Sequence, residues 1–319
     1  MKLIVQIPCR NEEEYLPITL RDIPRKIEGV DCVEILVIDD GSADRTSDVA
    51  REAGVEHIIR FTNHKGLAAA FSAGLDACLK LGADIIVNTD ADNQYQGADI
   101  PKLIAPILAG KADIIVGDRE VGNIPHFSKT KIFLQKLGSF VVRRLSGTNI
   151  PDVTSGFRAF NREAALRLNV VSRFTYTLET IISAGRKSIA IDSVKIRTNQ
   201  KLRESRLFRS NFYYIKESII TLSKIFSMYR PLQIFTYIGT SIFTFGFLLG
   251  LRYLYFFFLQ STAGHIQSLI LSAICLIVGF QICLIGLVSE LISINREKLE
   301  DILYRIKKIE MKNVRGPKK

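Results

Sequence analysis

Two aspartates and a glutamine at alternate positions of one short segment are the side chains best suited to chemistry. Asp90, Asp92 and Gln94 follow an apolar run, residues 85–89, that is typical of a buried strand. A turn after such a strand would place three hard oxygen ligands on one side. Mg²⁺ and Mn²⁺ prefer such ligands and are usually held by one or two carboxylates together with substrate phosphates. The spacing alone fits an ordinary acidic loop equally well, so its surroundings must decide.

Charged side chains also end two other predicted strands. Asp39 and Asp40 follow residues 34–38, and Arg119 lies just past residues 114–117. Strand and helix signals alternate through the first half of the chain, which predicts a mostly parallel sheet with helices on both faces. Ligands of such sheets bind beyond the carboxyl ends of the strands. Packing does not explain charge at three strand ends of one edge, so we predict a binding site there.

The elements that must position these residues can be read from the hydrophobic pattern. The first helix would be capped by Asn11, with three glutamates in its first turn. A polar turn, residues 152–157, would precede a helix at residues 161–168. The expected strands are residues 3–7, 34–38, 58–61, 85–89, 114–117 and 189–196. The expected helices are residues 11–27, 44–53, 67–81, 98–109, 129–145 and 161–168.

Several other functional classes lack support in the sequence. No G-x-G-x-x-G follows the first predicted strand and no G-x-x-x-x-G-K-[ST] occurs, which argues against a dinucleotide fold and a P-loop. The five cysteines lie far apart without a C-x-x-C, so we expect reduced thiols rather than disulfides or a zinc site. The net charge is +11, but there is no zinc-finger spacing or RNA-binding aromatic box, and we predict no nucleic-acid partner.

Two apolar stretches near the C-terminus predict membrane-spanning helices. Residues 231–251 and 268–289 contain no charged side chain, and each has about the 20 residues that a bilayer core requires. Residues 252–267, rich in Tyr and Phe, would form an interfacial turn between them. Seven Lys or Arg in residues 201–230 and nine in residues 295–319 predict that both flanks are cytoplasmic. A soluble helical hairpin is the alternative, but its polar face is missing.

The chain therefore divides into four predicted parts. Residues 1–206 would form the α/β domain, residues 207–230 an amphipathic juxtamembrane helix, residues 231–294 a transmembrane hairpin, and residues 295–319 a basic tail, helical to about residue 311. The juxtamembrane helix would lie at the membrane interface or pack on the domain. The N-terminal segment is too short and too soon interrupted for a signal peptide, so we expect the first domain in the cytoplasm.

Five ordered motifs carry a family resemblance, which covers about residues 1–210. They are PCRNE at residues 8–12, VIDDGSAD at residues 37–44, residues 66–74, DADNQ at residues 90–94, and VTSGFR at residues 153–158. Together they resemble family 2 glycosyltransferases of the GT-A fold, and more narrowly the dolichyl-phosphate mannose synthase and polyprenyl-phosphate glycosyltransferase branch. The resemblance implies a Rossmann-like GT-A domain, an Mg²⁺ or Mn²⁺ ion, a nucleotide-diphosphate sugar donor, a polyprenyl phosphate acceptor and a lipid bilayer. It also admits a homo-oligomer.

The resemblance assigns a role to each matching residue. Arg119 would bind the acceptor phosphate or the donor diphosphate, and Asp92 and Arg119 would be catalytic. The metal ligands would be Asp90, Asp92 and Gln94. Nucleotide-sugar contacts would come from Pro8, Asn11, Glu12, Asp39, Asp40 and Asp90, and from Arg203 and Ser205 in a loop that closes over the donor. Lys131 and Ser155 would assist at the acceptor phosphate, although the match near residue 131 is loose and leaves the second phosphate-binding cation open.

The expected acceptor explains why no nucleophile–histidine pair is needed. A polyprenyl phosphate is already an anion, so it requires positioning and charge shielding rather than a strong base. One in-line displacement would invert the anomeric centre. Asp152 would orient the acceptor, act as a base, or cap the turn that follows it, and Arg158 would form an ion pair or touch phosphate. The four histidines are scattered and are expected to be ordinary loop or surface residues.

Three other functions remain open at this point. A polymer synthase of the same fold usually has more membrane helices and a Gln-x-x-Arg-Trp motif, whereas this chain contains no Trp. A non-catalytic membrane scaffold would partner a flippase or another transferase, but it would have no need of the metal ligands Asp92 and Gln94. A nucleotidyltransferase would carry a Gly-rich loop near the first strand, which is missing.

Overall fold

The computed structural model describes residues 1–120, 129–170, 176–199, 231–260 and 266–315. For most of these residues it also describes the exposure of the side chain. These residues form two compact units. The first consists of residues 1–199 together with residues 302–315, and the second of residues 231–301. Each unit is described by itself below.

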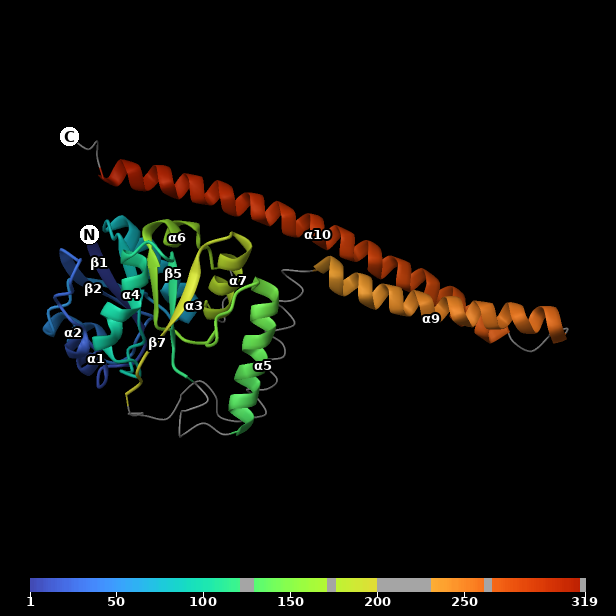
Figure 1. Ribbon diagram of the computed structural model, residues 1–319, viewed down its shortest axis with the longest axis horizontal. Coiled ribbons are helices and arrows are strands. Elements are labelled where there is room, and N and C mark those ends of the chain that lie inside the picture. Colours follow the sequence, from blue (N-terminus) through green and yellow to red (C-terminus); the bar gives the residue numbers. More distant parts are fainter. Residues whose placement is uncertain (121–128, 171–175, 200–230, 261–265, 316–319) are drawn as a thin grey trace. The chain divides into compact units, whose positions relative to one another are not determined.

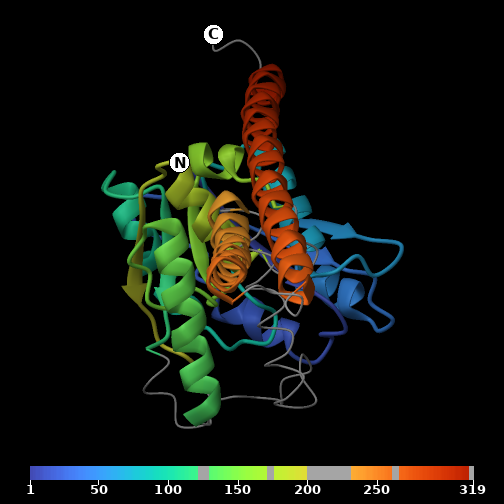
Figure 2. The same ribbon diagram turned by 90° about the vertical axis from the view of Figure 1, so that its right-hand side faces the viewer.

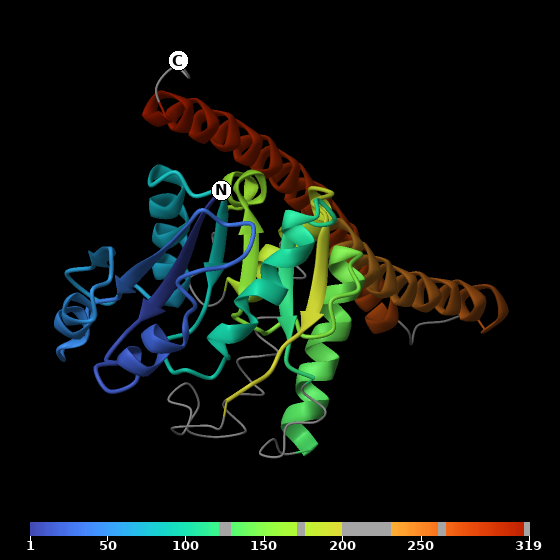
Figure 3. The same ribbon diagram turned by 60° about the vertical axis from the view of Figure 1, so that its left-hand side comes forward.

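A seven-stranded sheet forms the centre of the first unit (Figures 1 and 3). Its strand order is β3-β2-β1-β4-β6-β5-β7, and β6 alone of these strands runs antiparallel to its neighbours. The expected mostly parallel sheet is therefore confirmed. The strands are β1 (Lys2–Cys9), β2 (Cys32–Asp39), β3 (His57–Arg60), β4 (Ile85–Asn88), β5 (Ile114–Asp118), β6 (Arg158–Asn161) and β7 (Ile191–Lys195).

Helices cover both faces of the sheet, which is why the central strands are nearly continuous apolar runs. One face packs against α1 (Leu16–Asp22), α2 (Thr46–Glu52) and α4 (Ile100–Leu108). The other packs against α3 (Leu67–Lys80), α6 (Arg162–Arg167) and α7 (Thr177–Arg186). The helix α5 (Lys129–Ser146) lies against α7, and a short 3₁₀ turn, η1 (Gly97–Asp99), leads into α4.

The strand order reverses between β1 and β4, and this reversal determines where a ligand can bind. The chain proceeds from β1 to β2 and β3 on one side, and β4 pairs with the opposite edge of β1. At such a switch point the connecting loops leave in opposite directions and open a crevice beyond the carboxyl ends of the strands. The acidic turn at residues 90–94 follows β4 and so lies at this point.

The prediction that Asn11 caps a helix over residues 11–27 is wrong. Helix α1 begins only at Leu16, with Pro17 in its first turn, and ends at Asp22. Asn11 instead adopts a left-handed conformation with φ of 55°. Its side-chain oxygen accepts a hydrogen bond from the backbone N–H of Ala43 at 2.9 Å. The side chain that looked like a cap therefore holds the loop after β1 to the loop after β2.

The sequence pattern also missed β6 and α7. β6 contains only four residues, which begin with the charged Arg158, and it inserts between β4 and β5. Arg158 is nevertheless fully buried. A short strand that carries a buried charge has no alternating apolar pattern, so periodicity could not reveal it.

The second unit is an antiparallel helical hairpin with a seam of small residues. Helix α9 (Pro231–Gln260) lies beside the N-terminal part of α10 (Ile266–Arg315), as Figure 2 shows end-on. A Cβ added to Gly239 would lie 2.7 Å from the carbonyl oxygen of Gly279. The Ser272 hydroxyl donates to the carbonyl oxygen of Gly246 at 2.7 Å. Small side chains let the two backbones approach, as in packed membrane helices.

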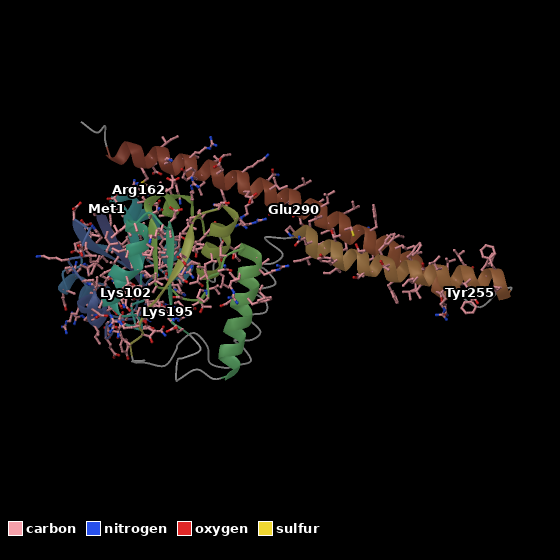
Figure 4. All side chains as sticks on the ribbon, viewed as in Figure 1. Met1, Lys102, Arg162, Lys195, Tyr255 and Glu290 are labelled. Atoms are coloured by element: carbon pink, nitrogen blue, oxygen red, sulfur yellow. The ribbon has the colours of Figure 1, made fainter. Side chains whose placement is uncertain are left out.

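The outer surface of this hairpin is apolar. Phe258 is 80% exposed, and Figure 4 shows Tyr255 extending outward from α9. Both helices are long and apolar enough to cross a membrane, and little of either apolar segment is buried. A core helix of a soluble protein would be mostly buried, so this exposure favours contact with lipid.

The expected interfacial turn at residues 252–267 is wrong for the residues that the structure describes. Residues 252–260 continue α9, and α10 has begun by residue 266. Residues between 260 and 266 lie outside the described part of the chain, as does the amphipathic segment predicted at residues 208–229.

The expected helix in the C-terminal segment is confirmed, and it is continuous with the second apolar helix because α10 runs to Arg315. Its last part belongs to the first unit, where it packs against α6. The Tyr304 hydroxyl donates to the Glu163 carboxylate at 2.5 Å, and Met311 is only 2% exposed within the core formed with α3 and α6.

Candidate functional site

The acidic turn after β4 contains two carboxylates whose charges are not cancelled. Asp90 and Asp92 are both half-buried, and the backbone N–H of Gln94 donates to Asp92 Oδ1 at 3.2 Å. Burial and the nearby negative charge of Asp92 raise the pKa of Asp90 to about 7, despite the opposing effects of Arg119 and a hydrogen bond from Tyr95. A second carboxylate beside the buried Asp90 gives this turn a concentration of negative charge that attracts a cation.

Tyr95 holds this turn to the neighbouring loop, and sequence reasoning gave it no role. Its hydroxyl hydrogen-bonds the Asp90 carboxyl and accepts the backbone N–H of Gly156 at 2.9 Å. Its ring stacks on Phe157 with centroids 5.2 Å apart. The only signal in the sequence is the position of Tyr95 directly after the acidic motif. That signal is weak, since a tyrosine at such a position is equally typical of a core residue.

The segment after β7 supports the same turn from the other side. The Asn199 backbone N–H donates to the carbonyl oxygen of Gln94 at 2.9 Å, and its side-chain amide donates to that of Asn93 at 3.0 Å. Asn93 adopts a left-handed backbone with φ of 53°. Hydrogen bonds from Tyr95 and Asn199 therefore fix a turn that its own conformation does not favour.

Gly156 is a glycine because Asp90 lies against it. A Cβ at this position would be 2.9 Å and 3.1 Å from the two carboxylate oxygens of Asp90 and 3.0 Å from the Tyr176 hydroxyl. The Asn88 side chain donates to the Gly156 carbonyl oxygen at 2.8 Å and to the Tyr176 hydroxyl at 2.9 Å. The structure thus connects the fourth and fifth sequence motifs through Asp90 and Gly156.

Arg119 and Asp152 form a buried ion pair beside this turn. Arg119 Nε donates to Asp152 Oδ2 at 2.7 Å, and Arg119 Nη2 donates to Asp152 Oδ1 at 3.0 Å and to the Thr154 hydroxyl at 2.8 Å. Burial alone would raise the pKa of Asp152, but the Arg119 charge and these hydrogen bonds outweigh it and lower that pKa. A carboxylate stabilised in its charged form is a poor base, so Asp152 is arranged to orient Arg119 and to cap its own turn through Thr154.

The contacts of Arg158 fit neither of the two expected roles, an ion pair or a phosphate contact. It is fully buried and donates to the carbonyl oxygens of Val153, Ser155 and Thr177 at 2.8 Å, and to the Thr180 hydroxyl. Burial lowers the pKa of its guanidinium to about 10. Arg158 therefore ties the turn at residues 153–155 to α7, which keeps Asp152 and Gly156 in place.

The carboxylates after β2 are used within the protein. Asp39 is fully buried, and it accepts hydrogen bonds from the backbone N–H of Ser42 at 2.8 Å and from the Ser47 hydroxyl. Asp40 is 4% exposed and accepts the N–H groups of Lys65 at 2.7 Å and Gly66 at 2.9 Å. Both side chains fix the loops that flank the edge of the sheet.

The other residues expected at the nucleotide, Pro8, Asn11 and Glu12, lie at the carboxyl end of β1 or in the loop that follows it. Pro8 is buried in β1 opposite Ile38. Glu12 is 6% exposed, and its backbone N–H donates to the Thr46 hydroxyl at 2.9 Å. Glu12 thus joins the loop after β1 to the start of α2, and Asn11 joins it to the loop after β2.

The remaining predicted site residues are only partly described. Ser155 is fully buried, and its hydroxyl has no hydrogen-bond partner among the described residues. Lys131 lies in the first turn of α5, in the part of that helix without described side chains, and Arg203 and Ser205 lie outside the described residues. Within the described part of the chain, no three His, Cys, Asp or Glu side chains group as a metal site. The available donor set is two carboxylates and the Gln94 amide, which suits a cation that takes further ligands from a phosphate.

Comparisons with known proteins agree with this architecture. The description "Glycosyl transferase family 2" matches residues 4–168. The polyprenol monophosphomannose synthase of Mycolicibacterium smegmatis is 33% identical over 176 residues, which are 53% of this chain and 65% of the relative. The undecaprenyl-phosphate mannosyltransferase of Micrococcus luteus is 32% identical over 169 residues, 51% of this chain and 68% of the relative. The chain thus spans about two thirds of the length of these relatives.

Solved structures support the fold. Glucosyl-3-phosphoglycerate synthase from Mycobacterium tuberculosis, crystallised with Mn²⁺, uridine diphosphate and phosphoglyceric acid, superposes with a TM-score of 0.55 at 20% identity, covering 71% of this chain and 78% of that chain. The expected GT-A fold is confirmed, and the family match extends over more than half of the sequence. The chain belongs to glycosyl transferase family 2, and it is a glycosyltransferase.

Proposed function

We propose that this protein transfers a hexose from a nucleotide-diphosphate sugar to a polyprenyl phosphate, of the dolichyl or undecaprenyl type. The names of the two relatives above support this acceptor. The observation that carries the proposal is the combination, in one chain, of the acidic turn beside the Arg119–Asp152 pair with two exposed apolar helices of membrane-spanning length. Both features suit a lipid-linked acceptor.

The acidic turn fits a divalent metal. Asp90, Asp92 and Gln94 would hold Mg²⁺ or Mn²⁺, and the mutual repulsion of the two carboxylates would be relieved by the positive charge. When bound, the ion supplies charge neutralisation to the diphosphate that leaves. Nucleotide contacts would come from the loops after β1 and β2, together with Arg203 and Ser205.

The acceptor needs a cation rather than a base. Arg119 Nε and Nη2 are committed to Asp152 and Thr154, so a phosphate contact would fall to Nη1. A guanidinium fixed in this way needs no reorganisation when the anion arrives. The acceptor oxygen would attack the anomeric carbon directly, and a single displacement inverts its configuration. Lys131 and Ser155 are proposed as further acceptor contacts.

The hairpin would anchor the enzyme where its acceptor resides. We place residues 1–206 and the tail at residues 295–319 on the cytoplasmic side, with residues 207–230 along the interface and the two helices within residues 231–294 in the bilayer. The basic flanks counted in the sequence suit anionic lipid headgroups.

Two alternatives make different predictions. A non-catalytic scaffold would have no need of two carboxylates with uncancelled charge at the sheet edge. The second alternative is a transferase of the same fold with another acceptor. Its support is the structural similarity to a synthase crystallised with phosphoglyceric acid.

The test uses membranes that contain the full chain, a short polyprenyl phosphate, Mn²⁺ or Mg²⁺, and a panel of labelled nucleotide sugars. We expect label from one donor in the lipid fraction, and loss of that label with EDTA and in the Asp92→Asn variant. Nucleotide binding without transfer to lipid from any donor would contradict the proposed acceptor.

A further inference from the structure

The cytoplasmic part of α10 carries an exposed apolar stripe. Leu299, Ile302, Ile306 and Ile309 are 65%, 52%, 56% and 62% exposed. Their spacing of three, four and three residues places them on one side of the helix, at the a and d positions of a heptad. We call these four residues the α10 stripe.

The stripe is separate from the surface by which α10 packs on the first unit. That surface contains Tyr304, which donates to Glu163, and Lys308, which lies 3.7 Å from the Glu163 carboxylate. Arg167 lies over the Tyr304 ring at 5.3 Å, and Met311 is buried. Packing among the described residues therefore does not account for the four exposed apolar side chains.

Lipid does not account for the stripe either, if the hairpin crosses a membrane as proposed. The uncharged stretch ends at Ser289, and no glycine or proline interrupts residues 287–315. These residues belong to the single helix α10. At 1.5 Å per residue, Leu299 lies about 15 Å and Ile309 about 30 Å beyond Ser289. The headgroup layer on each side is only roughly 5–8 Å thick, so the stripe emerges into water.

We propose that the α10 stripes of several copies of this chain pack together as a parallel coiled coil. The bilayer imposes the parallel arrangement, since every copy enters it with the same orientation. Leu and Ile at a with Ile at d favour more than two strands. The partner surface is thus the same stripe on another copy, which closes a symmetric assembly.

Charge complementarity supports this register. With Leu299 and Ile306 at a, Arg305 occupies a g position and Glu310 the e position of the next heptad. In a parallel coiled coil these two positions face each other across neighbouring strands. Each Arg305 would therefore meet the Glu310 of another copy, and the pair would recur at every interface of the assembly.

A polar side chain inside the apolar stretch points to the same contact independently. The Gln281 side chain is exposed on α10, three heptads before Ile302, and makes no hydrogen bond within the described part of the chain. A carboxamide that faces hydrocarbon lacks water to bind, whereas a second Gln281 across a helix interface would satisfy it.

Site-specific cross-linking in native membranes tests the contact. The background is Cys32→Ser, since Cys32 is the exposed cysteine among the described residues. We expect Ile302→Cys to form disulfide-linked dimers, and the exposed neighbour Asp301→Cys, one position off the stripe, to form about tenfold fewer because its side chain points away from the coiled-coil axis. Equal cross-linking at both positions would overturn the proposal.

Two further variants decide between self-association and other contacts. Ile302→Lys with Ile306→Lys should lower the oligomer-to-monomer ratio in native mass spectrometry by at least about tenfold, because each lysine replaces a buried apolar contact. Arg305→Glu should weaken the oligomer, and adding Glu310→Arg should restore it. A monomeric wild-type protein, or an Ile302→Cys side chain that lipid alone protects from a water-soluble maleimide, would overturn the proposal. Sugar transfer to a short acceptor, measured on the same preparations, reports separately on the proposed function.

Discussion

The two pairs of aspartates at the edge of the sheet occupy equivalent positions and have different surroundings. Asp39 ends β2 and Asp40 follows it, and their oxygens accept backbone N–H groups from the loops at residues 42 and 65–66. Asp90 and Asp92 follow β4 and receive fewer hydrogen bonds, and burial together with the charge of Asp92 raises the pKa of Asp90. The first pair stabilises the loops, and the second pair is the one that we propose binds a cation.

This difference shows that a carboxylate's role depends on the donors that surround it. A buried aspartate whose oxygens all accept hydrogen bonds contributes to stability, and its removal leaves N–H groups without partners. An aspartate with unused oxygen lone pairs and a like charge nearby destabilises the free protein slightly and gains on binding a cation. Substitution of single carboxylates tests this difference.

The largest effect is expected for Asp92→Asn. This change keeps the shape of the side chain and removes one negative charge from the proposed metal site, so sugar transfer should fall by roughly 10³-fold or more. Because Asp92 accepts only a weak 3.2 Å hydrogen bond, the melting temperature should stay within about 2 °C of the wild type. Transfer assays and thermal unfolding of the same preparation check both parts; a large loss of stability would mean that the two pairs do not differ.

The converse effect is expected for Asp40→Ala. Two backbone N–H groups, of Lys65 and Gly66, lose their acceptor, and His64 loses a partner at 2.8 Å. The free energy of unfolding should decrease by about 2–4 kcal/mol, since buried donors are left unsatisfied. Asp48→Ala, which removes an exposed ion pair with Arg51, is the matched control and should cost less than about 1 kcal/mol. Equal destabilisation by the two changes would contradict the structural role of Asp40.

A smaller effect separates two buried tyrosines near Gly156. Tyr95→Phe removes the hydrogen bond to Asp90, whereas Tyr176→Phe removes one to Asn88 and leaves Asp90 with its partner. The Mn²⁺ concentration for half-maximal binding should rise about 3–10-fold in Tyr95→Phe, because the carboxylate is no longer held in place, and by less than about 2-fold in Tyr176→Phe. Equal changes in both variants would show that Tyr95 acts only through packing.

The smallest effect concerns a third kind of carboxylate, Asp99, which is paired with cations. Burial alone would raise its pKa, but hydrogen bonds from Arg197 and Lys102 lower it to about 2. Its folded-state pKa lies below the unfolded value, so the stabilisation is present above about pH 4 and is lost as the pH falls toward 2. Asp99→Asn should cost about 1–2 kcal/mol at pH 7, because the half-exposed Arg197 is screened by water. In chemical denaturation of the full chain, the difference from wild type should shrink between pH 4 and pH 3; a constant difference would argue against the ion pair.

Much of the architecture could be predicted because the strands that form the core have simple patterns. Residues 85–87 are apolar and charge follows at Asp90, and the structure has a buried strand at Ile85–Asn88. The parallel order followed from alternating strand and helix signals. The two apolar helices could be predicted equally well, since each lacks charged residues over a stretch long enough to span a membrane.

The parts that could not be predicted depend on contacts between residues far apart in sequence. In its local sequence Asn11 resembles a helix cap. Its side-chain oxygen instead accepts a hydrogen bond from the backbone N–H of Ala43 on another loop. The insertion of β6 between β4 and β5 buries Arg158, whose guanidinium donates hydrogen bonds to four neutral oxygens. No local sequence pattern predicts where those oxygens lie. Tyr95 and Gly156 acquire their roles only when the fold brings residue 90 and residue 156 together.

The most direct test of the account is Mn²⁺ binding to the full-length protein with a nucleoside diphosphate present, followed by electron paramagnetic resonance. The wild type and a stability control, Asp48→Ala, should bind one ion with the same affinity, and Asp92→Asn should bind at least about 30-fold more weakly while it retains its fold. Undiminished Mn²⁺ binding by folded Asp92→Asn would contradict the claim that the turn after β4 is the metal site.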